Sequence, residues 1–250
     1  MTIHYDPQPD ASASVGTSEI VTYDARLQAV RRDSHARAGQ FGTSGLSRAG
    51  IYRSGLKRVF DLAVVLLALP LILLTVGLFA LLVARDGGNP FYTQSRVGRN
   101  GRIYRMWKLR SMVVGADAKL EDHLSANPNA REEWDSTQKL KSDPRITRFG
   151  RILRKSSMDE LPQLWNVFIG DMSLVGPRPM MPSQQELYPG LAYYRLRPGI
   201  TGPWQVSKRN ESSFADRAHF DQDYDRTVSL FTDLGLLIRT VRVVLRATGY

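Results

Sequence analysis

The chain has 250 residues, a formal net charge of +10 and no cysteine, which excludes disulfides, thiolate metal sites and a cysteine nucleophile. The excess positive charge lies entirely after residue 50, because residues 1–50 hold five basic and five acidic side chains. A basic domain of this kind attracts polyanions: nucleic acid, anionic lipid or phosphorylated substrates.

The first fifty residues are rich in Ser, Ala, Gly, Asp and Arg and show little apolar periodicity. A segment of this composition buries too little apolar surface to offset the entropy lost on ordering it. No apolar run follows Met1, so the segment does not read as a signal peptide. We predict a disordered N-terminal tail over residues 1–50.

A long apolar run, from Leu62 to Ala84, has 23 residues without a charge. A straight helix of that length spans roughly 35 Å, enough for about 30 Å of bilayer hydrocarbon, so a membrane-spanning helix is the default interpretation. Pro70 inside the run favours a kink, and basic residues on both sides favour keeping both flanks in the cytoplasm. A re-entrant helix over residues 51–86 satisfies both constraints. The residues alone leave both paths open, because proline is common in membrane helices.

The region after the apolar run contains the pattern of a β-hairpin. Residues 91–93 and 103–107 read as short strands around the turn Arg99-Asn100-Gly101, and Asn-Gly is a strong hairpin signal. Residues 116–140 are highly charged, and we predict helices there with a break near Asn127-Pro128.

The remaining elements alternate helices with rigid loops. Asp143-Pro144 has the pattern of an N-cap followed by the first helical position, and an amphipathic basic helix is predicted after it. Residues 161–168 predict a short apolar helix, and residues 230–246 predict a helix with an apolar and a basic face. The helix after Pro144 and the helix over residues 230–246 could each lie at a membrane interface. Each could equally pack its apolar face on a protein core and expose its basic face to solvent. Two loops rich in Pro and Gly, 174–179 and 197–204, lie between them.

Two adjacent carboxylates, Asp159 and Glu160, follow closely after a group of basic residues. Ser157 and Glu160 have capping-box spacing, so the pair could serve only to cap a helix. Either Ser157 or Asp159 as the cap places Asp159 near the positive end of a helix, which favours the ionised carboxylate, as nearby arginines also do.

An ionised carboxylate beside a phosphate has three chemical uses. It can bind Mg²⁺, act as a base, or attack phosphorus to form an acyl-phosphate. Arg154 and Arg178 are the candidates to clamp the phosphate oxygens, because guanidinium groups bind them in a bidentate manner. A carboxylate pair alone is a weak signal of catalysis.

The order of motifs around the pair identifies a family. The motifs are Lys57-Arg58-Val59-Phe60-Asp61, the run Gln94 to Gly101, Trp107-Lys108-Leu109-Arg110-Ser111-Met112, Asp143-Pro144-Arg145-Ile146-Thr147, Leu153-Arg154-Lys155, Asp159 to Gln163, Gly170 to Pro179 and Arg197 to Gly202. This series, over about residues 55–248, closely resembles the bacterial sugar transferases, the monotopic polyprenyl-phosphate phosphoglycosyl transferases. The chain resembles the short form of that family.

The resemblance implies an enzyme that transfers a sugar phosphate from a UDP-sugar to undecaprenyl phosphate, with Mg²⁺ as cofactor. It assigns the nucleophile to Asp159 and gives Glu160 a supporting part in metal binding or proton handling. Arg154 matches a phosphate-contacting arginine, Arg178 the arginine of a Pro-Arg-Pro motif linked to nucleotide binding, and Lys108 a substrate-binding lysine. The stretch Gly202-Pro203-Trp204-Gln205 resembles the branch that primes exopolysaccharides with hexose phosphates.

The resemblance also implies a fold and a location. We expect an α+β, mostly helical monotopic membrane protein, with a re-entrant helix kinked at Pro70, amphipathic interfacial helices and a small β-hairpin or sheet. The transferase domain, residues 87–250, would lie on the cytoplasmic face of the bacterial inner membrane and contact lipid but no nucleic acid. Homo-oligomer formation and the identity of the sugar stay open. The rival hypothesis is a non-enzymatic, membrane-anchored adaptor whose basic face binds anionic lipid or nucleic acid.

Overall fold

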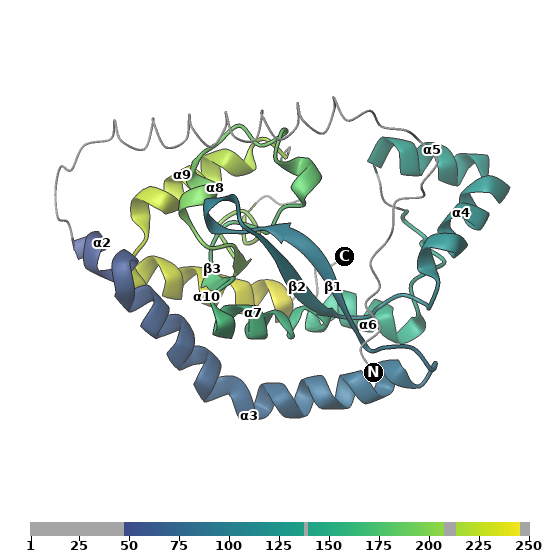
Figure 1. Cartoon of the computed structure of the whole chain (residues 1–250), viewed down its shortest axis with the longest axis horizontal. Helices are drawn as coiled ribbons and strands as arrows, with labels where there is room; N and C mark the ends of the chain where they lie inside the picture. The colour runs from purple at the N-terminus through teal and green to yellow at the C-terminus, as the bar shows by residue number, and fades with distance from the viewer. Residues whose placement is uncertain (1–47, 138–139, 208–213, 246–250) are drawn as a thin grey trace, which may run out of the picture. The chain divides into compact units, whose positions relative to one another are not determined.

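In the computed structural model, which describes residues 48–137, 140–207 and 214–245, the apolar run forms one helix, α3 (Lys57–Ala84). A short helix, α2 (Arg48–Ile51), and a π-helical segment, Tyr52–Leu56, lead into it. Pro70 lies at the midpoint of α3, and Figure 1 shows the helix axis changing direction near its middle. A proline in a helix interior removes one hydrogen bond and crowds the preceding turn, so the bend has a local cause.

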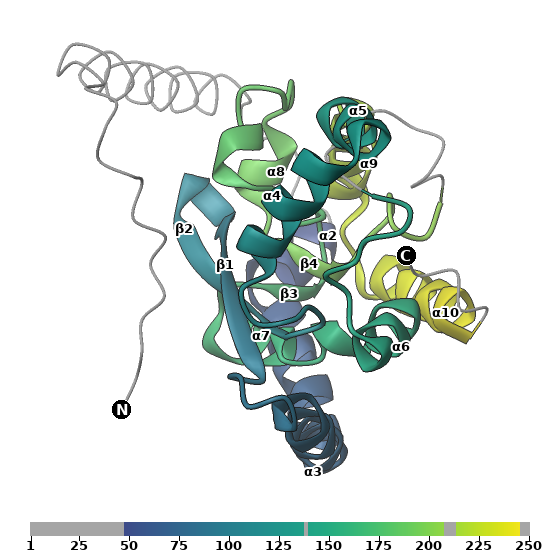
Figure 2. The same cartoon turned by 90° about the vertical axis from the view of Figure 1, so that its right-hand side faces the viewer.

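Both halves of α3 pack against the rest of the chain. In the first half, Asp61 is buried and accepts a 2.7 Å hydrogen bond from the Oγ of Ser173. In the second half, Val83 packs in one cluster with Leu109 and Leu153. Figures 1 and 2 both show α3 lying below the helices that it contacts. The outer face of α3 is exposed and apolar, with Leu66, Leu67, Leu71, Leu74, Leu78 and Leu81 more than half exposed.

A buried polar cluster joins the start of α3 to the last helix, α10 (Leu230–Leu245). Asp233 is fully buried, and Lys57 donates a 2.6 Å hydrogen bond to one of its carboxylate oxygens. Tyr52 donates to the same oxygen at 2.7 Å, and Tyr224 donates to the other at 2.6 Å. The negative charge of Asp233 is therefore paired and fully hydrogen-bonded, as a buried carboxylate must be.

The predicted hairpin is confirmed. Strands β1 (Phe91–Val97) and β2 (Ile103–Leu109) pair antiparallel and are longer than the sequence pattern indicated. Asn100 and Gly101 adopt positive φ angles of 60° and 76°, a conformation that these two residue types accept most readily.

The charged region forms two helices, α4 (Ala116–Ala126) and α5 (Pro128–Thr137), which confirms the predicted break. The helix predicted to start at Asp143-Pro144 begins later, because Thr147 is the N-cap of α6 (Arg148–Ser156) and accepts a hydrogen bond from the N–H of Gly150. Asp143 instead pairs with the side chain of Arg145 at 2.7 Å. The N-cap prediction at Asp143 was therefore wrong.

The second half of the chain brings the two rigid loops together. Helix α7 (Gln163–Ile169) is followed by strand β3 (Ser173–Val175), which pairs in parallel with β4 (Gly199–Thr201). Helices α8 (Ala192–Arg195) and α9 (Arg217–Thr227) lie on either side of β4 in sequence, and the predicted C-terminal helix is α10. Gly176 allows the close approach of the loops, because a Cβ there would lie 2.2 Å from the carbonyl oxygen of Arg197.

The architecture agrees with a mostly helical α+β protein with small two-stranded sheets. Among the residues that the structure describes, one helical stretch, Tyr52–Ala84, is long and apolar enough to cross a membrane. The predicted disordered tail lies outside the described residues, apart from residues 48–50 at the start of α2. The re-entrant path stays a prediction.

Candidate active site

The carboxylate pair lies in a single 3₁₀ turn, Met158–Glu160, between α6 and α7. Ser157 ends α6 in the left-handed conformation, with a φ of 57°, and α7 starts only after Pro162. Ser157 occupies the N-cap position of this turn but makes no side-chain capping bond, so the predicted capping box is absent. Asp159 lies inside the turn, and the prediction of Asp159 as a cap was wrong. A residue with positive φ interrupts a helix, and this interruption leaves Asp159 and Glu160 on a tight connection.

Lys108, on β2, holds the second carboxylate of the pair. Its Nζ donates a 2.8 Å hydrogen bond to Oε1 of Glu160 and lies 3.9 Å from Oδ2 of Asp159. Burial opposes ionisation of Glu160, but Lys108 and then Arg178 lower its pKa below the usual range. Burial likewise opposes the charge on Lys108, and Glu160 outweighs it, so the pKa of Lys108 is raised. The two side chains form a charged pair.

Asp159 has the opposite tendency. It is 8% exposed, and burial raises the pKa of Asp159 to about 6, although Lys108 and Arg154 act to lower it. The expectation that its surroundings favour the ionised form was wrong, because the loss of hydration outweighs the nearby cations. A carboxylate with such a pKa is more basic than an exposed one and still largely ionised at pH 7.

Arg154 and Arg178 approach the pair from two sides. Arg154, in the last turn of α6, donates a 2.8 Å hydrogen bond from Nε to Oγ of Ser111 and lowers the pKa of Asp159. Arg178 follows β3, lines a cavity together with Glu160 and lies 5.7 Å from the ring of Trp204. The structure therefore gathers Lys108, Arg154 and Arg178 around Asp159 and Glu160.

Two further arginines, which the sequence reasoning did not assign, lie near Arg178. They are Arg96 on β1 and Arg217 on α9, whose guanidinium carbon is 4.2 Å from the Trp204 ring centre. Nε and Nη1 of Arg96 and Nε of Arg217 are buried without a hydrogen-bond partner. Burial and the charge of Arg178 lower the pKa of both side chains, that of Arg217 to about 10. The buried, partnerless donors of Arg96 and Arg217, beside the charge of Arg178, constitute a site for an anion.

Two hollows flank the carboxylate turn and share Leu161 and Leu164. One, of about 280 Å³, includes the side chains of Glu160, Arg178 and Gln205. Oε1 of Gln205 is buried without a hydrogen-bond partner, so this hollow offers both cationic donors and a free acceptor. The other is lined only by aliphatic, proline and aromatic side chains.

In the described part of the chain, no three His, Cys, Asp or Glu side chains are grouped so that they could hold a metal ion. Asp159 and Glu160 nevertheless fit the common arrangement in which one or two carboxylates hold Mg²⁺ together with substrate phosphates.

Comparisons with known proteins identify the family of this chain. The sequence model of the family described as bacterial sugar transferase matches residues 52–247. A UDP-galactose-lipid carrier transferase of Erwinia amylovora is 49% identical over 196 residues, which cover 78% of this chain and 41% of that protein. An undecaprenyl-phosphate galactose phosphotransferase of Salmonella typhimurium is 44% identical over 200 residues, which cover 78% of this chain and likewise 41% of the relative. The exopolysaccharide production protein ExoY of Sinorhizobium fredii is 45% identical, with 77% and 87% covered.

This chain thus spans about two fifths of the length of the first two relatives and most of the third. The match covers α3, the hairpin, the carboxylate turn and the arginines around it. On this match, the chain belongs to the bacterial sugar transferase family.

Proposed function

We propose that the protein transfers a hexose 1-phosphate from a UDP-sugar to undecaprenyl phosphate and so starts the synthesis of an exopolysaccharide. One observation carries the proposal: a buried carboxylate, Asp159, directly precedes Glu160, on which Arg178 and Arg96 act, and Arg96 has buried donors without a partner that suit phosphate. The names of relatives, a UDP-galactose-lipid carrier transferase and an undecaprenyl-phosphate galactose phosphotransferase, support the donor and the acceptor. The family match favours this reaction over the adaptor hypothesis.

In the first step, an ionised oxygen of Asp159 attacks the phosphorus that bears the sugar. The bond from that phosphorus to the bridging oxygen of the diphosphate breaks, and UMP leaves with that oxygen. The product on the protein is a phosphosugar-aspartate. The raised pKa of Asp159 supports this role, because a more basic carboxylate is a better nucleophile while it stays ionised at neutral pH.

In the second step, an oxygen of undecaprenyl phosphate attacks the same phosphorus. The acyl-phosphate bond breaks, the carboxylate of Asp159 is regenerated, and the sugar diphosphate lipid leaves. Lys108 keeps Glu160 ionised and fixes its position next to the reacting carboxylate. Mg²⁺, held by Glu160 and Asp159 with the donor phosphates, would neutralise charge on the diphosphate.

The donor is placed by the arginines. Arg96 and Arg217 supply buried N–H groups for the diphosphate, and Arg178 adds a third positive charge. The ring of Trp204 packs against Arg178 and Arg217. Arg154 lies on the Asp159 side, where it would stabilise charge on the transferred phosphoryl group. The hollow that contains Gln205 offers a hydrogen-bond acceptor to a sugar hydroxyl.

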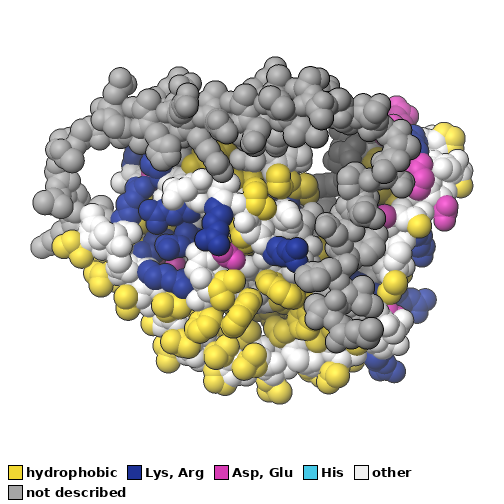
Figure 3. Space-filling model, viewed as in Figure 1, with side chains coloured by type: hydrophobic (Ala, Val, Ile, Leu, Met, Phe, Trp, Pro, Cys, Tyr) yellow, Lys and Arg dark blue, Asp and Glu magenta, His cyan; other side chains and the backbone are white. Residues whose placement is uncertain are grey.

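We further propose that α3 is re-entrant and holds the transferase domain at the cytoplasmic face of the inner membrane. The packing of both halves of α3 against one domain supports this path, since a straight spanning helix would carry one end away to the far leaflet. Figure 3 shows Lys and Arg side chains gathered beside a broad band of apolar ones, the arrangement expected where a protein rests on an anionic membrane.

The reaction is tested by UMP release from a panel of UDP-sugars by the purified protein, with undecaprenyl phosphate and Mg²⁺. UDP-galactose comes first, because two relatives are named for galactose. We expect turnover with at least one UDP-hexose, and none after Asp159→Asn. After incubation with the donor alone, intact-protein mass spectrometry should show a hexose phosphate adduct on the wild type. Full UMP release by Asp159→Asn would refute the nucleophile assignment.

A further inference from the structure

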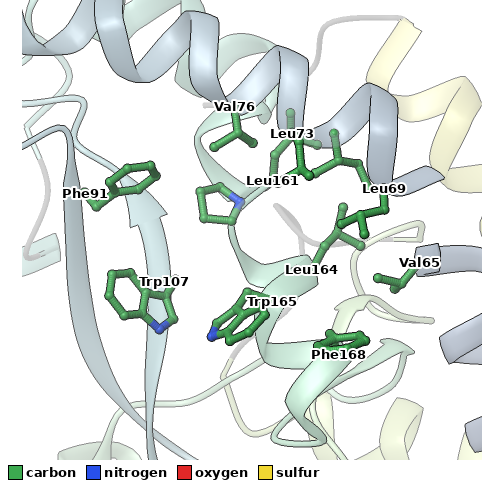
Figure 4. A pocket seen from close by; sticks show the side chains of 12 residues that line it. Val65, Leu69, Leu73, Val76, Phe91, Trp107, Leu161, Leu164, Trp165 and Phe168 are labelled. Carbon is green, nitrogen blue, oxygen red and sulfur yellow. The ribbon is translucent and has the colours of Figure 1, made fainter.

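An apolar groove of about 330 Å³ lies inside the bend of α3. Figure 4 shows its side chains converging from three elements: α3, the hairpin, and the segment that begins α7. Its lining is Val65, Leu69, Ile72, Leu73, Val76, Phe91, Trp107, Leu161, Pro162, Leu164, Trp165 and Phe168. None of these side chains is charged, and only the two indoles carry a polar atom.

The groove adjoins the hollow that includes Glu160 and Arg178, because Leu161 and Leu164 line both. Leu161 and Pro162, in its lining, directly follow Glu160. Trp107, on the opposite wall, precedes Lys108 on β2, and the side chain of Lys108 points to the other face of the strand, where it is bonded to Glu160. A molecule in the groove therefore has apolar walls along its length, and the carboxylate turn lies next to the wall that Leu161 forms. This order matches an amphiphile whose phosphate lies at the tip of an apolar chain.

We propose that this groove holds the first isoprene units of the polyprenyl phosphate acceptor and aims its phosphate at Asp159. The inference rests on the proposed function, which requires such an acceptor, and adds where on this chain its hydrocarbon binds. The polar donor does not fit there, because the lining would leave its hydroxyl and phosphate oxygens without hydrogen bonds. The hollow on the Arg178 side has those partners.

The position of the groove favours a prenyl chain over the acyl chain of an ordinary phospholipid. In a prenyl phosphate the hydrocarbon starts at the carbon bonded to the phosphate oxygen. In a phospholipid a glycerol unit and an ester separate the phosphate from the acyl chain. A groove whose wall runs directly into the Asp159-Glu160 turn leaves no polar segment for the glycerol and esters.

The groove contributes position more than affinity. In a bilayer, the prenyl chain is already surrounded by hydrocarbon, so moving it into an apolar groove gains little from the hydrophobic effect. The walls instead restrict where the phosphate can lie relative to the reacting phosphorus. Misplacing a reacting group by about 1 Å can cost roughly 100-fold in rate, so filling the groove should affect transfer to the lipid strongly.

Adjacent leucines on α3 provide a matched test. Leu73 lines the groove, whereas Leu74 does not, and both are exposed, by 62% and 72%. Leu73→Trp fills the groove, and Leu74→Trp adds the same bulk to the outer face. We expect Leu73→Trp to lower kcat/KM for undecaprenyl phosphate about 10- to 100-fold, with the single-turnover UMP burst from donor alone unchanged. Leu74→Trp should leave both unchanged.

Equal acceptor kinetics in Leu73→Trp and wild type would overturn the inference, provided that the wild type gives the UMP burst. Absence of the burst in the wild type would instead contradict the proposed function. A second measurement identifies the occupant. In nanodiscs, a polyprenyl phosphate with a diazirine near its phosphate end should label peptides containing Trp107 or Trp165. If a diazirine phospholipid labels those peptides and the polyprenyl phosphate probe does not, the groove holds a bulk lipid. That result would also overturn the inference.

Discussion

Lys108 is bonded to Glu160 rather than to Asp159, with Nζ 2.8 Å from Oε1 of the glutamate. The cation is 3.9 Å from the nearest carboxylate oxygen of Asp159, so it offsets the burial of that residue only in part. This unequal sharing separates the ionisation of the two carboxyls. Glu160 has a lowered pKa, and Asp159 has a pKa raised to about 6.

The first prediction follows from the protonation of Asp159. Only the ionised carboxylate attacks phosphorus, so the single-turnover rate of UMP release should rise with pH through about 6 and level off above it. The rate should fall about tenfold for each pH unit well below that midpoint. Rapid-quench measurement between pH 4.5 and 8.5 checks it, with protein stability followed in parallel. A rate that stays constant across this range would contradict the assignment.

The second prediction uses the two neighbours of Asp159 as opposite perturbations. Lys108 lowers the pKa of Asp159, so Lys108→Met should shift the midpoint of the pH profile upward. Glu160 raises it, so Glu160→Gln should shift the midpoint downward, whatever the loss in maximal rate. The readout is the midpoint of the residual single-turnover rate. Shifts in the same direction would show that Asp159 is not the titrating group.

The third prediction concerns the unpaired arginines. Arg217→Met removes one of the two arginines with buried, partnerless donors, so the UDP-sugar should bind about 10- to 100-fold more weakly, as expected for lost charged hydrogen bonds. In the absence of the UDP-sugar, the same change should leave the melting temperature unchanged or raise it. The substitution removes a charge that is unfavourably buried and is repelled by Arg178. Donor KM and differential scanning fluorimetry measure the two effects.

Arg226→Met is the matched control for that experiment. Arg226 lies on the same helix, α9, but is exposed. We expect neither donor KM nor melting temperature to change in this variant. A lowered melting temperature in Arg217→Met would indicate that Arg217 holds the fold rather than an anion.

The fourth prediction concerns packing beneath the active site. A Cβ on Gly150 would lie 1.9 Å from the carbonyl oxygen of Ser111, the residue whose hydroxyl holds Arg154. Gly150→Ala should lower the free energy of unfolding by about 1–3 kcal/mol or more, because the helix must move away. A Cβ on Gly235 meets nothing within 4 Å, so Gly235→Ala should be neutral or stabilise by up to about 1 kcal/mol. Urea unfolding in detergent compares the two helical glycines.

The fifth prediction concerns the path of α3. The chain has no cysteine, so single cysteines report topology without background. Ser54 and Asn100 are exposed and lie before and after α3. We expect Ser54→Cys and Asn100→Cys to react with an impermeant maleimide from the cytoplasmic side only. Labelling of the two positions from opposite sides would rule out a re-entrant helix.

Local chemistry allowed much of the fold to be predicted from the sequence. Asn100-Gly101 predicted the hairpin because few other residue pairs accept its backbone conformation, and the proline at 128 predicted the break between α4 and α5. At Asp143 local chemistry was insufficient, because the carboxylate found a partner in Arg145 and the cap passed to Thr147.

The site was predicted less completely than the fold. The motifs selected Lys108, Arg154, Asp159, Glu160 and Arg178, and the structure brings them together. Arg96 and Arg217 were missed, since only the pairing of β1 and the position of α9 bring such distant residues to Arg178. The raised pKa of Asp159 was missed for a related reason: it depends on burial, which residue spacing does not report.

The buried pair of Lys57 and Asp233 has a consequence for the order of assembly. The two residues are 176 positions apart, so translation at about 5–20 residues per second separates their synthesis by roughly 10–35 s. During that interval α3 has been synthesised but Asp233 has not. The charge of Lys57 is therefore unpaired and can remain in contact with water. On the proposed membrane path, α3 can therefore enter the bilayer early, and its final packing against the domain is delayed until α10 has been made.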